Sequence, residues 1–181
     1  APVDARVADL LARMTLEEKV AQLLGIWNRK REIQNAQGGF DRTNAKAVIG
    51  FGIGEVSRPS EVARPTSGAL YRPAREHALF VNAVQKWLVE NTRLGIPAMF
   101  HEEALHGLTA PVGTHFPVPI GLASTWDPAL IERLMSVAAL EGRARGTQHV
   151  LAPVVDLGRD PRWGRIEETY GEDPYLVTQM G

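Results

Sequence analysis

Hydrophobic residues recur every three to four positions in several stretches of the chain, which is the period of an α-helix with one buried face. Two short helices are expected at the start: one follows Asp4, and the next follows a capping box that runs from Thr15 to Glu18. The most regular stretch spans residues 75–91, with apolar positions at Phe80, Val81, Val84, Trp87 and Leu88. The pattern therefore predicts three helices before residue 92.

Two further helices are predicted where an aspartate is followed directly by a proline. Asp127 is suited to the N-cap position and Pro128 to the first helical position, and Gly146 ends this helix. Asp173 and Pro174 begin another helix in the same way.

Short apolar runs between the helices predict three strands, at about residues 48–53, 96–100 and 150–157. Residues 27–47 are polar and show no period, so they are expected to form loop or irregular structure. A loop rich in proline and serine is expected between the first strand and the helix at 75–91. Because helices and strands alternate, the expected fold class is α/β with a parallel sheet.

Three strands are fewer than half of a closed (β/α)8 barrel, which needs eight strands and typically about 250 residues. The chain is therefore expected to be the first part of a TIM-like barrel that is incomplete alone. A parallel sheet that stops at its third strand leaves an unpaired edge, which favours aggregation. The sequence thus predicts that further strands complete the sheet.

Polar residues gather directly after the second and third predicted strands. Glu102, Glu103 and His106 follow the second strand. The cluster after the third strand contains Arg159, Asp160, Arg162 and Arg165. Because the carboxyl ends of parallel strands form the ligand-binding rim of α/β folds, both clusters are expected at one pocket. Carboxylate, imidazole and guanidinium groups together suit a neutral polyhydroxylated ligand such as a sugar.

An alternative role for these residues is a network of ion pairs that fastens the loops. We favour ion pairing for Asp160 and Arg165, because loop arginines beside carboxylates more often bind each other than a ligand. For Glu103 and Arg159 we favour ligand binding. Trp163 lies between arginines and is expected either to stack on a sugar ring or to cover the end of the barrel.

Two motifs that resemble cofactor sites fail on spacing. His101 and His106 are five residues apart, whereas a zinc-binding helix needs its two histidines four apart. Five steps place two side chains about 140° apart around a helix. Gly50 and Gly52 lie in a glycine-rich run, but Glu55 occupies the place of the third glycine of the dinucleotide fingerprint. No metal and no cofactor are therefore expected.

The composition is that of a globular protein with no expected affinity for nucleic acid or membranes. The 181 residues are 44% hydrophobic and 23% charged, and the net charge of −1 provides no field that attracts polyanions. The longest uncharged run, residues 104–126, contains several prolines and two histidines and is expected to be loop. With no cysteine, the chain has neither disulfides nor a thiolate nucleophile. A periplasmic or secreted location is favoured over a cytoplasmic one.

Several stretches of the chain resemble the family-three glycoside hydrolases, which include β-glucosidases and β-xylosidases. The longest and most specific is APVVDLGRDPRWGR at residues 152–165, continued by IEETYGEDP. MTLEEKVAQL at residues 14–23 is similar to the family's first helix, and HEEALHG at residues 101–107 is similar to the loop after its second strand. The likeness covers most of the chain and is poorest at residues 27–72.

The resemblance implies that residues 1–181 are the amino-terminal segment of a (β/α)8 catalytic domain. Such an enzyme releases terminal non-reducing β-D-xylosyl or β-D-glucosyl residues with retention of configuration. By position, Glu103 matches the family's carboxylate that binds sugar hydroxyls, and Arg159 matches the arginine that binds the same glycosyl unit. His106 is expected to orient the loop of Glu103. Glutamate at position 103, where many glucosidases have aspartate, resembles the xylosidase branch.

The family's nucleophilic aspartate lies on a later barrel strand, and its acid/base usually lies in a following domain. The resemblance therefore implies no catalytic residue in this chain, which is expected to be inactive alone. The expected partners are an oligosaccharide or aryl β-glycoside substrate, together with the remaining barrel strands and the following domain, on the same or another chain. Two alternatives are a non-catalytic sugar-binding fragment and a metal-dependent hydrolase, of which the histidine spacing disfavours the second.

Overall fold

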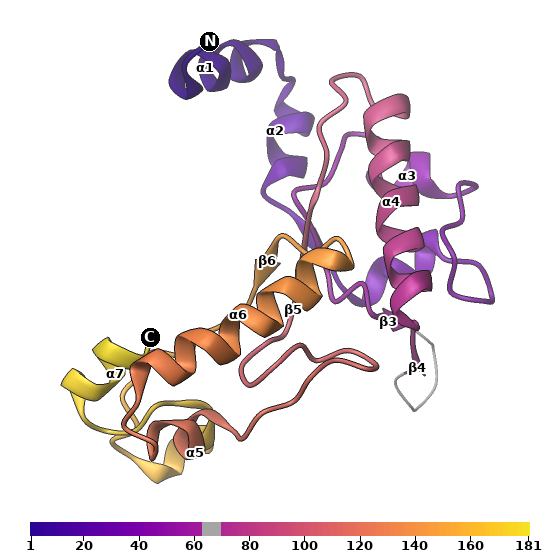
Figure 1. Ribbon diagram of the computed structural model, residues 1–181. Helices are drawn as coiled ribbons and strands as arrows, with labels where there is room; N and C mark the ends of the chain where they lie inside the picture. Colours follow the sequence, from indigo (N-terminus) through magenta and orange to yellow (C-terminus); the bar gives the residue numbers. More distant parts are fainter. Residues whose placement is uncertain (63–69) are drawn as a thin grey trace. The chain divides into compact units, whose positions relative to one another are not determined.

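The computed structural model has an α/β fold with a parallel sheet, and it describes residues 1–62 and 70–181 (Figure 1). The strand order of the sheet is β1-β2-β5-β6. The expected loop rich in proline and serine includes residues 63–69, which lie outside the described residues. The chain divides into two compact units, residues 1–100 and residues 101–181, and the boundary falls within β5. Each unit has a hydrophobic core of its own.

Unit 1 contains helices around two parallel strands and a small hairpin. Its elements are α1 Val3–Arg13, α2 Leu16–Gln22, β1 Gly25–Ile26, η1 Asn28–Ile33, α3 Ala45–Ile49, β2 Glu55–Ser57, β3 Glu61–Val62, β4 Leu70–Tyr71, α4 Ala74–Asn91 and the start of β5 Met99–Glu102. β1 pairs with β2 in parallel, and β3 pairs with β4 in antiparallel register. The apolar face of α4 packs into the core of this unit, because Phe80, Val84 and Leu88 are each at most 2% exposed.

Unit 2 begins with the end of β5 and contains one long helix. Its other elements are α5 Pro119–Ala123, α6 Pro128–Ala144, β6 His149–Val150, η2 Pro161–Trp163, η3 Ile166–Glu168 and α7 Pro174–Met180. β5 and β6 pair in parallel, with His101 opposite His149. The core of this unit is built from Leu122, Ala123, Ile131, Tyr170, Val177 and Met180.

The helix starts predicted at Thr15, Asp127 and Asp173 are confirmed by their caps, whereas the first helix begins at Val3, before Asp4, and has no side-chain cap. Both hydrogen bonds of the capping box are present at α2, where the Thr15 amide donates to the Glu18 carboxylate and the Glu18 amide donates to the Thr15 hydroxyl. Asp127 accepts a hydrogen bond from the amide of Leu130, and Asp173 does the same for α7. Helix α6 ends at Ala144, two residues before Gly146.

The predicted strand positions are partly wrong. Residues 48 and 49, where the first strand was expected to begin, belong to helix α3, because Ala45 and Ile49 lie four residues apart and are both fully buried on one helix face. The first predicted strand therefore lies at Glu55–Ser57. The two-residue strand β1 falls in a segment where no strand was expected. Among residues 1–62 and 70–181, no helix is long and apolar enough to cross a membrane.

The other two strands also differ from their predicted bounds. β5 spans Met99–Glu102, so His101 and Glu102 belong to the strand and not to the loop after it. β6 contains only His149 and Val150, whereas a strand had been expected over residues 150–157. Beyond Val150 the backbone forms only an isolated bridge between Val154 and Thr169. The length of a strand depends on where a neighbouring strand provides hydrogen-bond partners. Short apolar runs in the sequence do not reveal those positions.

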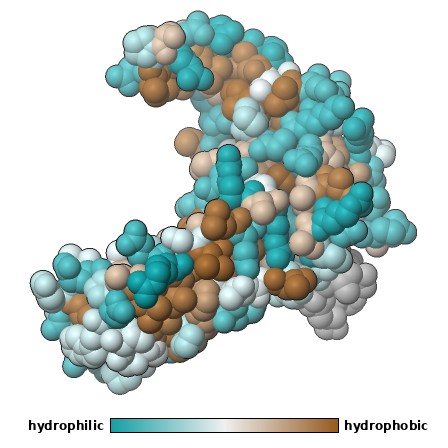
Figure 2. All heavy atoms as spheres, in the orientation of Figure 1, coloured by the Kyte–Doolittle hydropathy of each residue, from teal (hydrophilic) through white to brown (hydrophobic). Residues whose placement is uncertain are grey.

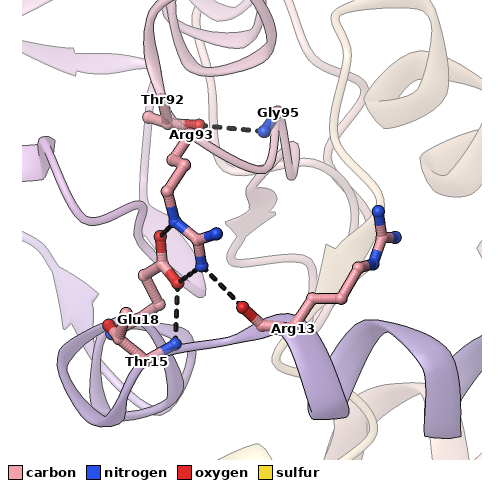
Figure 3. A network of polar contacts seen from close by, with 6 residues as sticks. All are labelled: Arg13, Thr15, Glu18, Thr92, Arg93 and Gly95. Carbon is pink, nitrogen blue, oxygen red and sulfur yellow. Dashed lines mark hydrogen bonds and ion pairs between the residues drawn. The ribbon is translucent and has the colours of Figure 1, made fainter.

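A buried carboxylate connects α2 to the turn after α4 within unit 1 (Figure 3). Glu18 is 6% exposed and accepts hydrogen bonds from the guanidinium of Arg93 and the backbone amide of Thr15. Arg93 also donates to the carbonyl oxygen of Arg13 at 2.6 Å. The hydrogen bonds from Arg93, and next that from Thr15, hold the pKa of Glu18 below its ordinary value. The network thus fastens the two amino-terminal helices to the end of α4.

Replacing Glu18 by glutamine is expected to lower the melting temperature at pH 7 by roughly 3 °C, because the half-exposed Arg93 loses its ion pair with this buried carboxylate. The folded state holds the Glu18 pKa low, so the stabilisation is complete above the ordinary pKa of 4.5 and is lost as the pH falls through the lower folded value. The difference between the two proteins should therefore shrink at pH 3. Thermal melts followed by circular dichroism measure both effects. Glu17→Gln, at an exposed position of the same helix turn, is the control; an equal loss in both variants would contradict the role of the ion pair.

Candidate functional site

The first loop of the candidate site follows β5 in unit 2. Glu103 is the residue directly after the strand and is half-buried, and its carbonyl oxygen accepts a hydrogen bond from the amide of Thr109 at 2.9 Å. His106 lies three residues further on, and its Nδ1 atom is 3.1 Å from the carbonyl oxygen of Phe116. His106 thus ties the start of the loop to its far end, in agreement with an orienting role.

Helix α6 holds the far side of this loop. Glu141 accepts hydrogen bonds from both the amide and the hydroxyl of Thr114, at 2.9 and 2.6 Å. These bonds lower the pKa of Glu141. Gly107 has a φ of 104°, and a Cβ there would lie 1.9 Å from the carbonyl oxygen of Thr114. Only glycine fits at this position, so the loop after Glu103 has a defined path.

The second loop follows β6 and is closed at its base by a hydrogen bond from the Gly158 amide to the carbonyl oxygen of Gly171 at 2.9 Å. Asp160 accepts hydrogen bonds from both the amide and the guanidinium of Arg162, each at 3.0 Å. Arg162 holds the pKa of Asp160 below its ordinary value. Asp160 is therefore ion-paired, as the alternative to ligand binding expects.

Arg165 is held by an ion pair within the loop after β6. Its guanidinium forms a two-pronged ion pair with Glu168, whose hydrogen bonds are the main cause of a raised Arg165 pKa. The negative charges of Asp156 and Glu103 raise that pKa further. Arg165 also lies over the ring of Trp163, with 6.0 Å between the guanidinium carbon and the ring centroid. The charge of Glu103, from the loop after β5, therefore acts on a residue of the loop after β6.

Two predicted sugar-binding side chains of the second loop are accessible. Trp163 is 43% exposed. Arg159 is exposed, and its guanidinium makes no hydrogen bond or ion pair within the part of the chain that the structure describes. Its backbone amide donates to the carbonyl oxygen of Leu157 at 2.8 Å, which anchors the main chain but leaves the side chain available. Arg159 thus has the donor capacity that a ligand with several hydroxyl groups requires.

Asp156 was not singled out from the sequence, although it ends the apolar run before Arg159 and is exposed. The sequence could have identified Asp156, because it is an acidic residue near the end of a predicted strand, and the same feature identified Glu103. The ring of His149 lies 5.9 Å from that of His101 because the two residues are partners in the β5–β6 pair. Strand register, which the sequence does not state, creates this contact.

A cavity of about 800 Å³ also lies in unit 2, along α6. None of the predicted sugar-binding residues lines it, although their neighbours Ala104 and Leu105 do. The residues predicted to bind a sugar therefore lie outside this cavity.

The model of the glycosyl hydrolase family 3 N terminal domain matches residues 15–181. A putative beta-xylosidase from Formosa agariphila is 36% identical over 180 residues, which cover 98% of this chain and 22% of that protein. A periplasmic beta-glucosidase from Salmonella typhimurium is 33% identical over 178 residues, or 98% of this chain and 20% of that protein. The chain therefore spans about a fifth of the length of these two relatives.

The fold is also similar to solved structures. A b-glucosidase from Erythrobacter marinus matches with a TM-score of 0.79 and 36% sequence identity, over 97% of this chain and 22% of that protein. The family model alone covers more than half of the chain. The chain belongs to glycosyl hydrolase family 3.

Proposed function

We propose that this chain is part of a retaining, exo-acting glycoside hydrolase that releases terminal non-reducing β-D-xylosyl or β-D-glucosyl residues from oligosaccharides or aryl β-glycosides. The names of the relatives, beta-xylosidase and beta-glucosidase, support this substrate class. The names do not separate the two sugars, and Glu103 favours xylose only through its likeness to the xylosidase branch. A periplasmic or secreted location accords with the name of the Salmonella typhimurium relative.

In this proposal the chain provides part of the pocket for the terminal sugar. Glu103 accepts hydrogen bonds from two sugar hydroxyls, and Arg159 donates to the same sugar through its planar guanidinium. His106 holds the loop that carries Glu103, and Trp163 stacks on the sugar ring. Asp160 and Arg165 support the loop through their ion pairs with Arg162 and Glu168.

The family match over residues 15–181 is the observation that carries the proposal. Within unit 2 the negative charge of Glu103 also raises the pKa of Arg165, so an acidic group of the loop after β5 acts on the basic loop after β6. A neutral ligand with many hydroxyl groups needs both kinds of group at once, whereas a phosphate or a metal ion needs only one. The accessible ring of Trp163 adds an apolar face for a sugar.

The reaction itself needs two carboxylates that this chain does not provide. In a retaining mechanism one carboxylate attacks the anomeric carbon, and the other, about 5 Å away, protonates the leaving oxygen and then activates water. Glu103 is assigned to binding, so neither role falls to it. Residues 1–181 are the amino-terminal segment of a (β/α)8 domain in this proposal, and the remaining strands and a following domain provide both groups.

Turnover measurements on two proteins test the proposal. The chain of 181 residues should release no 4-nitrophenol from 4-nitrophenyl β-D-xyloside or β-D-glucoside, whereas the longer polypeptide that contains it should release one of the free sugars first as the β-anomer. Proton NMR of early product distinguishes this anomer. Turnover by the 181 residues alone would refute the assigned division of roles. Sugar-dependent stabilisation of that chain, with an inactive longer polypeptide, would instead favour a non-catalytic sugar-binding protein.

A further inference from the structure

The loop after β5, residues 103–116, is closed on itself by hydrogen bonds among its own residues. The amide of Phe116 donates to the carbonyl oxygen of His106 at 2.8 Å, and the Nδ1 atom of His106 is 3.1 Å from the carbonyl oxygen of Phe116. The amide of Thr109 donates to the carbonyl oxygen of Glu103 at 2.9 Å. These bonds join loop residues to one another, so they give the loop that carries Glu103 a defined internal shape.

Helix α6 attaches this loop to the rest of unit 2, and the loop runs alongside that helix (Figure 1). Glu141 accepts hydrogen bonds from the amide and the hydroxyl of Thr114, at 2.9 and 2.6 Å. Arg145, at the C-cap of α6, donates to the carbonyl oxygen of Pro111 at 2.8 Å. Residues four apart lie on the same face of a helix, so one carboxylate and one guanidinium hold the loop from the same side.

The attachment through Glu141 is strengthened by charge. The hydrogen bonds from Thr114, and after them the positive charge of Arg145, hold the pKa of Glu141 below its ordinary value, so this carboxylate is ionised at neutral pH. A hydrogen bond to an ionised acceptor is about twice as strong as one between neutral groups. Arg145 is 7% exposed, so its own bond to Pro111 is largely shielded from water.

The position of this loop matters because a group that binds the substrate must be held to within about 0.5 Å of its productive place. A displacement of about 1 Å can reduce the rate by as much as 100-fold. Glu103 lies in a loop, and the bond that its carbonyl oxygen accepts comes from the same loop. The rigid helix α6 is therefore suited to fix the place of the loop through Thr114 and Pro111.

We propose that Glu141 is a positioning residue for Glu103: by holding Thr114, it keeps the loop after β5 where the Glu103 carboxylate binds the terminal sugar. The inference rests on the proposed function, because Glu141 acts through the sugar-binding role assigned to Glu103. Glu141 itself is assigned no contact with the sugar.

Replacing Glu141 in the longer polypeptide tests the proposal. Glu141→Ala removes both hydrogen bonds to Thr114 and should lower kcat/KM for the preferred 4-nitrophenyl β-glycoside by ~10-fold, because the binding carboxylate is then displaced. Glu141→Gln should keep kcat/KM within about 3-fold, since its carbonyl can accept from the Thr114 amide and its amide can donate to the Thr114 hydroxyl oxygen. Steady-state kinetics measure both effects.

The same substitutions in a Glu103→Gln background separate positioning from a general loss of stability. There Glu141→Ala should lower kcat/KM by no more than about 2-fold, because the carboxylate that it positions is absent. The melting temperature, followed by circular dichroism, should fall by the same amount in both backgrounds. Thr114→Val removes only the hydroxyl bond at an exposed position and should lose ~3-fold in the wild type alone, which covers a Glu141→Ala variant that fails to fold.

Glu132→Ala is the matched control, because Glu132 is an exposed carboxylate of the same helix. Figure 2 shows hydrophilic as well as hydrophobic residues on the surface in the region of α6. An exposed substitution there should leave kcat/KM within about 2-fold of the wild type.

A wild-type kcat/KM for both Glu141→Ala and Thr114→Val would overturn the positioning role. A loss by the same factor in the wild-type and Glu103→Gln backgrounds would overturn it as well, since Glu141 would then not act through Glu103. Glu103→Gln by itself distinguishes this failure from failure of the proposed function. If that variant keeps the wild-type kcat/KM, the sugar-binding role of Glu103 is refuted and the positioning role with it.

Discussion

Replacing Glu103 by glutamine in the longer polypeptide is expected to lower kcat/KM for the preferred 4-nitrophenyl β-glycoside by ~100-fold or more. The carboxylate is assigned two hydrogen bonds to sugar hydroxyls, and bonds with a charged acceptor are about twice as strong as those between neutral groups. Glutamine keeps the size of the side chain but offers one acceptor atom and no charge. Steady-state kinetics with both glycosides measure the loss.

Glu167→Gln is the control for Glu103, since Glu167 is an exposed carboxylate of the loop after β6. It should keep kcat/KM within about 2-fold, as expected for an exposed surface substitution. Azide should not restore activity to a Glu103→Ala variant, because azide replaces a missing nucleophile and Glu103 is assigned to binding. A wild-type rate for Glu103→Gln, or rescue by azide, would contradict the assigned role.

Replacing Arg159 by alanine should lower kcat/KM by ~100-fold, and replacing it by lysine should recover only part of that loss. Lysine retains the positive charge but not the planar fork of donors that can hold two hydroxyls at once. The graded effect separates a geometric role from a purely electrostatic one. It is measured as kcat/KM for the wild type and the two variants at one pH.

Arg162→Lys is the matched control for Arg159, because Arg162 is 89% exposed and paired with Asp160. An exposed ion pair contributes little, so this variant should retain the wild-type kcat/KM within about 2-fold. If Arg159→Lys were as active as the wild type while Arg162→Lys lost activity, the two arginines would have been assigned in the wrong order.

The candidate site could be predicted from the sequence only as two separate loops. Glu103 and Arg159 were identified because each follows a predicted strand, and that argument needs only the order of the elements. The charge of Glu103 acts on Arg165, which lies six positions beyond Arg159 and after a short 3₁₀ turn, so the order of the elements does not reveal this effect. It depends on the paths of the loops, and those paths depend on single interactions such as those of Gly107 and Glu141.

The starts of three helices were determined by the sequence itself, whereas α3 and α5 were not expected. A cap, a proline in the first turn and an apolar stripe act within a few residues of one another, so Thr15, Asp127 and Asp173 each mark a helix start without help from distant parts of the chain. The candidate binding residues of the two strand-end loops could also be identified from the sequence alone, because each loop follows an apolar run.

Only the tertiary structure decided where the strands begin and end. Ala45 and Ile49 became one buried helix face, and β6 stopped at Val150, because a strand exists only where a neighbour accepts and donates its backbone hydrogen bonds. The tertiary structure also brought His149 to His101 and formed a cavity of about 800 Å³ beside α6. These features depend on contacts between residues far apart in the chain. The spacing of hydrophobic residues indicates only how residues close in the sequence are arranged, so it could not predict them.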